Sequence, residues 1–187
     1  MRGFTLIELL VVIAILAVLA TATVLVLNPA ELLKQGRDST RIGDLSALHD
    51  AIALWTADVL NGSAYWTSVA RCTATSTKPG GATGCTYTSS SVTTGTGWIP
   101  LDFTKIAAGS PLSDLPVDPN NGATTCKGAT TTMCQYAFAA GATVGVYELN
   151  AQMESAKFYV GGSSHITDKD GGTMPDVYEV GSDLTQI

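Results

Sequence analysis

Charged residues are scarce in this chain of 187 residues, making up 14% of it, against about 25% in an average soluble protein. Basic residues are the rarer sign, with 10 Lys and Arg against 16 Asp and Glu. From Leu101 to Ile187, four lysines oppose ten acids, which gives a net charge of -6. A protein that binds nucleic acid through its phosphates presents a basic surface, so we expect no direct nucleic-acid binding by this chain.

The common catalytic motifs are also missing. The sequence has no Gly-x-Ser-x-Gly elbow, no Gly-Lys-Ser/Thr phosphate loop and no His-Glu-x-x-His pair. It contains only two histidines, which limits general acid-base catalysis by imidazole. We therefore expect that the protein is not an enzyme and requires no cofactor.

Four cysteines are present, and their spacing matches no zinc-site template. We expect disulfides instead, which form in an oxidising compartment. Four cysteines allow three pairings, and the sequence alone does not distinguish them. Nearest-neighbour pairing closes short loops at low entropic cost, so we favour Cys72–Cys85 and Cys126–Cys134.

One long apolar run is present near the N-terminus. The 19 residues from Leu9 to Leu27 carry no charge, and a helix of about 20 residues crosses a hydrocarbon core of about 30 Å. A cleaved signal peptide is the alternative, but its apolar part is shorter and ends in a small-residue cleavage site. Asn28-Pro29 follows the run here, so we expect a membrane-spanning helix.

Glu8 directly precedes the apolar run. An ionised carboxylate at this depth costs roughly 2.5 to 3.5 kcal/mol on insertion scales, and it marks a candidate functional residue. No Lys or Arg lies between Phe4 and Glu31 that could pair with it on the same helix. Cleavage after Gly3 would create a backbone amine as a partner, and such a pair could set the register between packed helices.

The residues from Arg2 to Leu10, RGFTLIELL, resemble the prepilin signature of bacterial type IV pilins and type II secretion pseudopilins. The resemblance implies that prepilin peptidase removes a leader of residues 1–3 by cutting between Gly3 and Phe4. It also implies that Phe4 becomes N-methylated. In such filaments, the acid that matches Glu8 neutralises the terminal amine of a neighbouring subunit.

This resemblance implies a structural subunit of a type IV pilus-like surface filament. The subunit would be stored in the inner membrane, polymerised with identical copies by the membrane assembly machinery, and displayed outside the cell. A pseudopilin of a type II secretion or competence system is an alternative, although the head size and the Thr-rich loop favour a pilin. A third reading is a membrane-anchored calcium-binding or adhesive surface protein that does not polymerise.

The helix is expected to continue beyond the apolar run, to about Leu60. Pro29 predicts a kink or local melt near residues 25–29. Residues 4–27 then form the polymerisation helix, and residues 28–60 form an amphipathic half beneath a head. The apolar stripe comprises Ile42, Leu45, Leu48, Ile52, Trp55 and Val59. The remaining faces carry Lys34, Arg37, Asp38, Arg41, Asp44, Asp50 and Asp58.

Residues 61–187 are expected to form this head, in an α+β fold. Of the 25 residues in 73–97, 18 are Ser, Thr or Gly, which predicts a loop. Alternating or β-branched runs predict strands at 134–140, 143–149, 156–160 and 177–180. We expect an antiparallel sheet of three or four strands packed on the helical stripe.

Acidic residues near the C-terminus form a candidate calcium site: Asp168, Asp170, Asp176 and Glu179. Three of them fall at the first, third and twelfth places of an EF-hand count. Thr173 stands where that count wants a glycine, and Pro175 interrupts it. The resemblance adds that major pseudopilins bind calcium near their C-termini. An acidic, solvated turn is the alternative.

Overall fold

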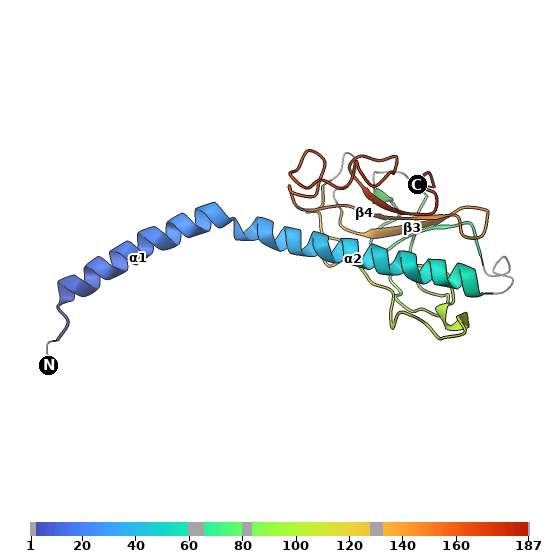
Figure 1. The fold of residues 1–187 in the computed structure, drawn as a ribbon, viewed down its shortest axis with the longest axis horizontal. Helices are drawn as coiled ribbons and strands as arrows, with labels where there is room; N and C mark the ends of the chain where they lie inside the picture. Colours follow the sequence, from blue (N-terminus) through green and yellow to red (C-terminus); the bar gives the residue numbers. More distant parts are fainter. Residues whose placement is uncertain (1–2, 60–65, 80–83, 128–132, 187) are drawn as a thin grey trace.

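The computed structural model describes residues 3–59, 66–79, 84–127 and 133–186. Figure 1 shows a long rod with the N-terminus at one end and, at the other, a head that holds the C-terminus. Its elements, in chain order, are α1 (Leu6–Leu27), α2 (Pro29–Asp58), β1 (Ala70–Cys72), β2 (Thr86–Tyr87), the 3-10 helix η3 (Phe103–Lys105), β3 (Tyr136–Ala140), β4 (Tyr147–Ala151) and β5 (Tyr178–Gly181).

Helix α1 begins with a capping box. The Thr5 hydroxyl accepts the N–H of Glu8 at 3.3 Å, and the Glu8 carboxylate accepts the N–H of Thr5 at 2.8 Å. Both side chains satisfy backbone donors that the first turn of a helix leaves without partners. A single acidic residue therefore begins a helix of 22 residues that is otherwise apolar apart from two threonines.

The break between the helices lies at Asn28, inside the expected window of residues 25–29. Asn28 has φ 41° and ψ 74°, in the left-handed region, and its side chain accepts the N–H of Glu31 at 3.4 Å. Pro29 is the first residue of α2, where its missing N–H leaves no hydrogen bond unmade. The chain thus forms two helices separated by one residue, not one helix with an internal kink.

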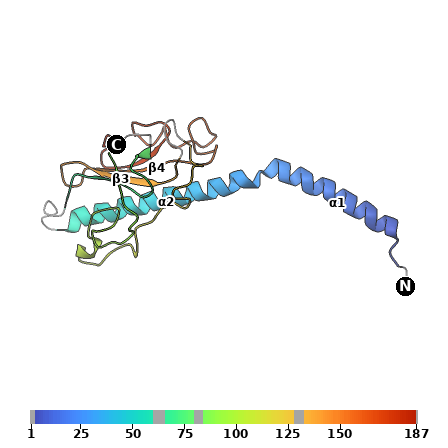
Figure 2. The same cartoon turned by 180° about the vertical axis from the view of Figure 1, so that it is seen from behind.

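The second half of α2 lies inside the head. Figures 1 and 2 show the sheet on one side of α2 and the segment that carries η3 on the other. The expected stripe supplies the core, because Leu45, Leu48, Ile52 and Trp55 are fully buried. Trp55 also donates its ring N–H to the carbonyl of Asp102 at 2.9 Å, which ties α2 to the turn before η3.

The sheet has the order β2-β1-β3-β4-β5. Its neighbours are antiparallel, except for the short parallel pair β1–β2. The expected α+β arrangement, a long helix with a mostly antiparallel sheet on its second half, is confirmed. The strand count is corrected from three or four to five among the described residues.

Three strand expectations need correction. Strands β1 and β2 were not predicted, and β2 lies within the expected loop 73–97. Strand β4 begins at Tyr147 and not at residue 143, because residues 141–146 form a turn in which Gly145 has φ 81°. Residues 156–160 form turns with local hydrogen bonds, such as Tyr159 N–H to Ser155 O at 3.4 Å, and no strand.

The two faces of the sheet differ in chemistry. Tyr147, Leu149 and Ala151 of β4 belong to the core formed with α2. The alternate residues Glu148 and Asn150 therefore lie on the opposite face, which we call the outer face. Both are 0% exposed, so this face is buried although it is polar.

Candidate functional site

Helix α1 is the most exposed apolar surface of the described chain. Its described side chains are exposed, and Phe4 just before it is 85% exposed. The helix is long and apolar enough to cross a membrane. Burying such a surface against lipid or against other helices is strongly favourable, so α1 is built for a partner outside the subunit.

The Glu8 carboxylate lies at the start of this surface. It accepts hydrogen bonds from the N–H and the hydroxyl of Thr5, at 2.8 and 2.7 Å. No basic side chain forms an ion pair with it among the described residues. Gly3 and Phe4 precede the helix, are exposed and have no regular structure, so a peptidase could reach the bond between them.

Residues 1–24 match the family model described as the prokaryotic N-terminal methylation motif. This motif marks the type IV pilin and pseudopilin family. No curated protein and no solved structure shows significant similarity to the chain. The pilin-like identity therefore rests on the N-terminal segment, and processing by prepilin peptidase and assembly into filaments are what the motif implies.

Both disulfides of the pilin-like chain join nearest neighbours, Cys72–Cys85 and Cys126–Cys134. The first links β1 to the residue before β2, which holds two short strands in place within a polar segment. The sulfurs of the second lie near Glu154. Disulfide-bonded cysteines offer no thiolate, so this group is not a metal site.

The four acids expected as calcium ligands do not converge. Asp170 Oδ2 accepts the N–H of Glu179 at 2.8 Å, whereas Asp168 is exposed and pairs with His165 at 3.2 Å. Asp176 is half-buried on the same loop. All four are described residues, and no three of their carboxylates have oxygens within 4.8 Å of one another. This set does not form a site by itself, and calcium binding by the chain stays a prediction.

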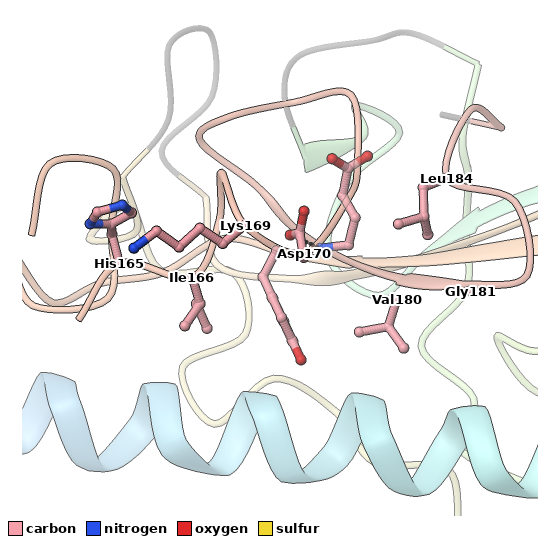
Figure 3. Close-up of a pocket in the computed structure, with 9 residues that line it drawn as sticks. His165, Ile166, Lys169, Asp170, Val180, Gly181 and Leu184 are labelled. Atoms are coloured by element: carbon pink, nitrogen blue, oxygen red, sulfur yellow. Dashed lines mark hydrogen bonds between the residues drawn. The ribbon is translucent and has the colours of Figure 1, made fainter.

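A cavity of about 420 Å³ lies between this loop and β5 (Figure 3). Its lining includes His165, Lys169, Asp170, Tyr178 and Glu179. The Lys169 ammonium points toward His165 and away from Asp170 (Figure 3). Lys169 forms no ion pair with Asp170.

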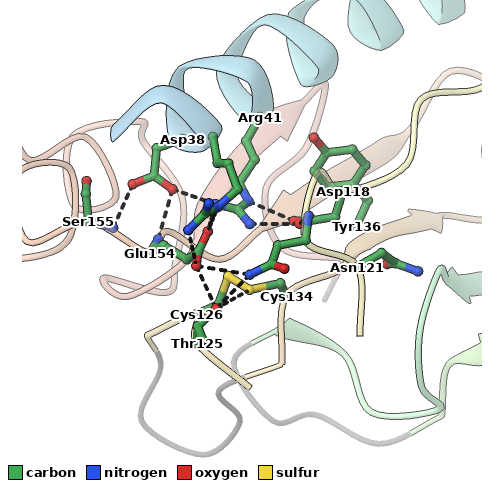
Figure 4. Close-up of a disulfide and its surroundings, with 12 residues drawn as sticks. Asp38, Arg41, Asp118, Asn121, Thr125, Cys126, Cys134, Tyr136, Glu154 and Ser155 are labelled. Atoms are coloured by element: carbon green, nitrogen blue, oxygen red, sulfur yellow. Dashed lines mark hydrogen bonds and ion pairs between the residues drawn. A yellow bond between two sulfur atoms is a disulfide. The ribbon is translucent and has the colours of Figure 1, made fainter. Parts of the chain in front are cut away.

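A second polar site was missed by the sequence reasoning. Asp38 and Arg41 were expected on the exposed faces of α2, but both are 0% exposed. Arg41 donates two hydrogen bonds of 2.7 Å to Asp118, one of 2.7 Å to Asp38 and one of 3.2 Å to Glu154 (Figure 4). Arg37 also binds Glu154, at 2.5 and 3.0 Å. We call these five residues the Arg41 cluster.

The Arg41 cluster fixes α2 to two distant loops. Asp38 accepts the backbone N–H groups of Glu154 and Ser155 at 2.9 and 2.8 Å, just beyond β4. Asp118 lies on the loop before the second disulfide, so its contact with Arg41 attaches that loop to α2 as well. Burial alone would favour the neutral guanidine, yet hydrogen bonds and charges from Asp118 and Asp38 raise the pKa of Arg41 above its usual value. The cluster thus holds α2 in one register beneath the sheet.

Acid should weaken this cluster through Glu154. Burial alone would raise the pKa of Glu154, but hydrogen bonds from Arg37 and Thr125 and the charge of Arg41 lower it to about 2. A folded-state pKa below the unfolded value stabilises the protein above pH about 4.5, and this contribution is lost as pH falls through about 2. We expect wild type to be more stable than Glu154→Gln at pH 6 by about 3 kcal/mol, and to lose this advantage by pH 2.

Urea unfolding of both proteins at pH 6, 4 and 2 checks this expectation. The three tryptophans, Trp55, Trp66 and Trp98, all lie in the head, so their fluorescence reports its unfolding. The comparison with the variant removes the effect of other acids whose pKa shifts oppose that of Glu154. A difference between the two proteins that does not change with pH would contradict the charge-based account.

Proposed function

We propose that this protein is the structural subunit of a type IV pilus-like surface filament. The observation that carries the proposal is the combination of the methylation motif with an apolar helix that makes no part of the head's core. The head buries one face of the second half of α2 and makes no use of α1, so α1 remains as a separate surface for lipid or for other subunits. Polymerisation would bury α1 at the filament axis and leave the heads outside.

Two functional states would use the same helix. Before assembly, α1 would span the inner membrane. Its length matches the thickness of the hydrocarbon core, and its side chains are apolar enough to lie there. After cleavage, the Phe4 amine of a neighbour would supply a cation for Glu8, which forms no ion pair among the described residues of its own subunit. Pairing between neighbours would neutralise both groups where water is excluded, and it would fix the axial offset of each subunit.

A surface-displayed pilin is favoured over a pseudopilin by the polar segment 73–97. Strand β2 lies in this segment, is exposed and contributes Tyr87, which is 53% exposed, to the head surface. The head contains two disulfides, as suits a protein that works in an oxidising exterior.

Electron microscopy and mass spectrometry of filaments sheared from the cell surface test this proposal. We expect long filaments whose subunit begins at Phe4 and carries one added methyl group. Subunits that keep residues 1–3 would contradict the processing. A cleaved subunit found only in the membrane, with no surface filaments at native expression, would favour a pseudopilin or an anchored protein.

A further inference from the structure

The outer face of the sheet places three polar side chains together. Asn150 of β4 lies directly opposite Glu179 of β5, and Glu148 is the next residue on the same face of β4. Residues paired in this way have Cβ atoms about 4.5 to 5.5 Å apart, so their side chains are neighbours. All three are at most 1% exposed.

The side chain of Asn150 has no partner for its amide. Neither its Oδ1 nor its Nδ2 makes a hydrogen bond within the part of the chain that the structure describes. Burying an amide without hydrogen bonds costs about 1 to 3 kcal/mol, so native proteins rarely leave one in this state. A fully buried amide oxygen beside two carboxyl groups points to a small group that it contacts.

The two glutamates form an acidic pair. Glu179 lies beside Glu148 on the outer face, and Glu179 Oε1 makes no hydrogen bond within the described residues. Burial and this contact with Glu148 raise the pKa of Glu179 to about 8. Among the described residues, Glu179 has no ion pair with a basic side chain. A cation at this position would neutralise two carboxyl groups that are buried side by side.

We propose that the outer face binds a hard metal cation of the calcium type through Glu148, Glu179 and Asn150 Oδ1. Hard cations of this kind take carboxylate and amide oxygens as ligands. All three side chains are closed off from solvent, which suits a bare ion better than an organic ligand. The cavity beside Glu179 provides a path from the solvent.

The C-terminal loop closes over this site without supplying its acids. Met174 donates its backbone N–H to Glu179 Oε2 at 2.8 Å. A Cβ added to Gly172 would collide with the same carboxylate, so the glycine lets the loop pack against Glu179. The proposed ligands therefore come from β4 and β5. Of the four acids that the sequence suggested, only Glu179 is among them.

Calcium titration of the full-length protein in detergent tests this site. After treatment with a chelator, wild type should bind one Ca²⁺, measured by calorimetry, and its Tm should rise by about 5 °C at saturation. Glu179→Gln keeps the shape of the side chain but removes its charge, so it should lose both the binding and the Tm shift. Asn150→Asp adds a carboxylate and should show a larger Tm shift than wild type. Mg²⁺ and Na⁺ in place of Ca²⁺ identify the preferred ion.

The matched control is the double variant Asp168→Asn with Asp176→Asn, which changes loop acids outside the proposed ligands. It should retain the Ca²⁺-dependent Tm shift. Loss of the shift in this control, with the shift retained in Glu179→Gln, would place the ion in the loop and overturn the proposal. Wild type that binds none of the three ions would also overturn it, and would leave water as the partner of Asn150. Filament assembly plays no part in these measurements.

Discussion

Replacing Arg41 with alanine is expected to lower the free energy of unfolding of the head by about 3 to 5 kcal/mol. The guanidinium is fully buried and contacts Asp38, Asp118 and Glu154. Its removal leaves three carboxylates in a region that water does not reach, and Arg37 contacts only one of them. A loss of this size is a large part of the stability of a typical domain, about 5 to 15 kcal/mol.

Arg37→Ala is the matched control, because it removes an arginine from the same cluster. The Arg37 side chain is 32% exposed, and Glu154 would keep its contacts with Arg41 and Thr125. We expect a loss of about 1 kcal/mol. Urea unfolding in detergent, followed by tryptophan fluorescence, measures both variants. Equal losses would show that the cluster acts as a diffuse charge, not through the buried guanidinium.

Replacing Glu8 with glutamine is expected to reduce the number of surface filaments by an order of magnitude or more. A tenfold reduction corresponds to about 1.4 kcal/mol of lost assembly free energy. Glutamine keeps the size of the side chain and can still accept the Thr5 N–H, so helix α1 should begin normally. The terminal amine of the neighbouring subunit would lose its counter-charge in an apolar environment. Glu8→Ala should give the same result, and both variants should insert into the membrane at least as well as wild type.

Thr21→Val provides the control for this experiment. Thr21 lies within α1, and its hydroxyl donates to the Ala17 carbonyl of the same helix at 2.8 Å. Its replacement removes a polar group from α1 without changing a charge, so filament numbers should stay at the wild-type level. Immunoblots of the membrane fraction measure insertion, and immunoblots of the sheared fraction measure the amount of surface filament. Normal filament numbers from Glu8→Gln would exclude the pairing role of Glu8.

Periodicity predicted the core face of α2 correctly, because apolar residues at helical spacing report burial directly. It could not predict the Arg41 cluster. Two partners of Arg41, Asp118 and Glu154, lie 77 and 113 residues away in sequence, and a charged residue on a helix is by default expected in water. No local signal distinguishes the buried Arg41 from the partly exposed Arg37.

The strand errors have a different physical origin. Strands β1 and β2 have three and two residues, too few for an alternating pattern. The Cys72–Cys85 disulfide and their mutual pairing hold them together, and β1 pairs with β3. Residues 156–160 have strand propensity, but Gly161 with φ 80° and local hydrogen bonds turn the chain there. The sequence pattern placed the candidate ligands on one continuous loop. The buried acids Glu148 and Glu179 instead lie on two neighbouring strands, β4 and β5.

Asn28 gives the subunit a joint of one residue. The α1 side chains described here are exposed, and so is Asn28, which means that no core contact resists a change in direction between α1 and α2. Rotation at Asn28 can therefore reorient the head while every helical hydrogen bond is kept. Bending and stretching of a filament would then occur mainly at Asn28 of each subunit. Each head, fixed to α2 by its core and the Arg41 cluster, would move as a rigid body.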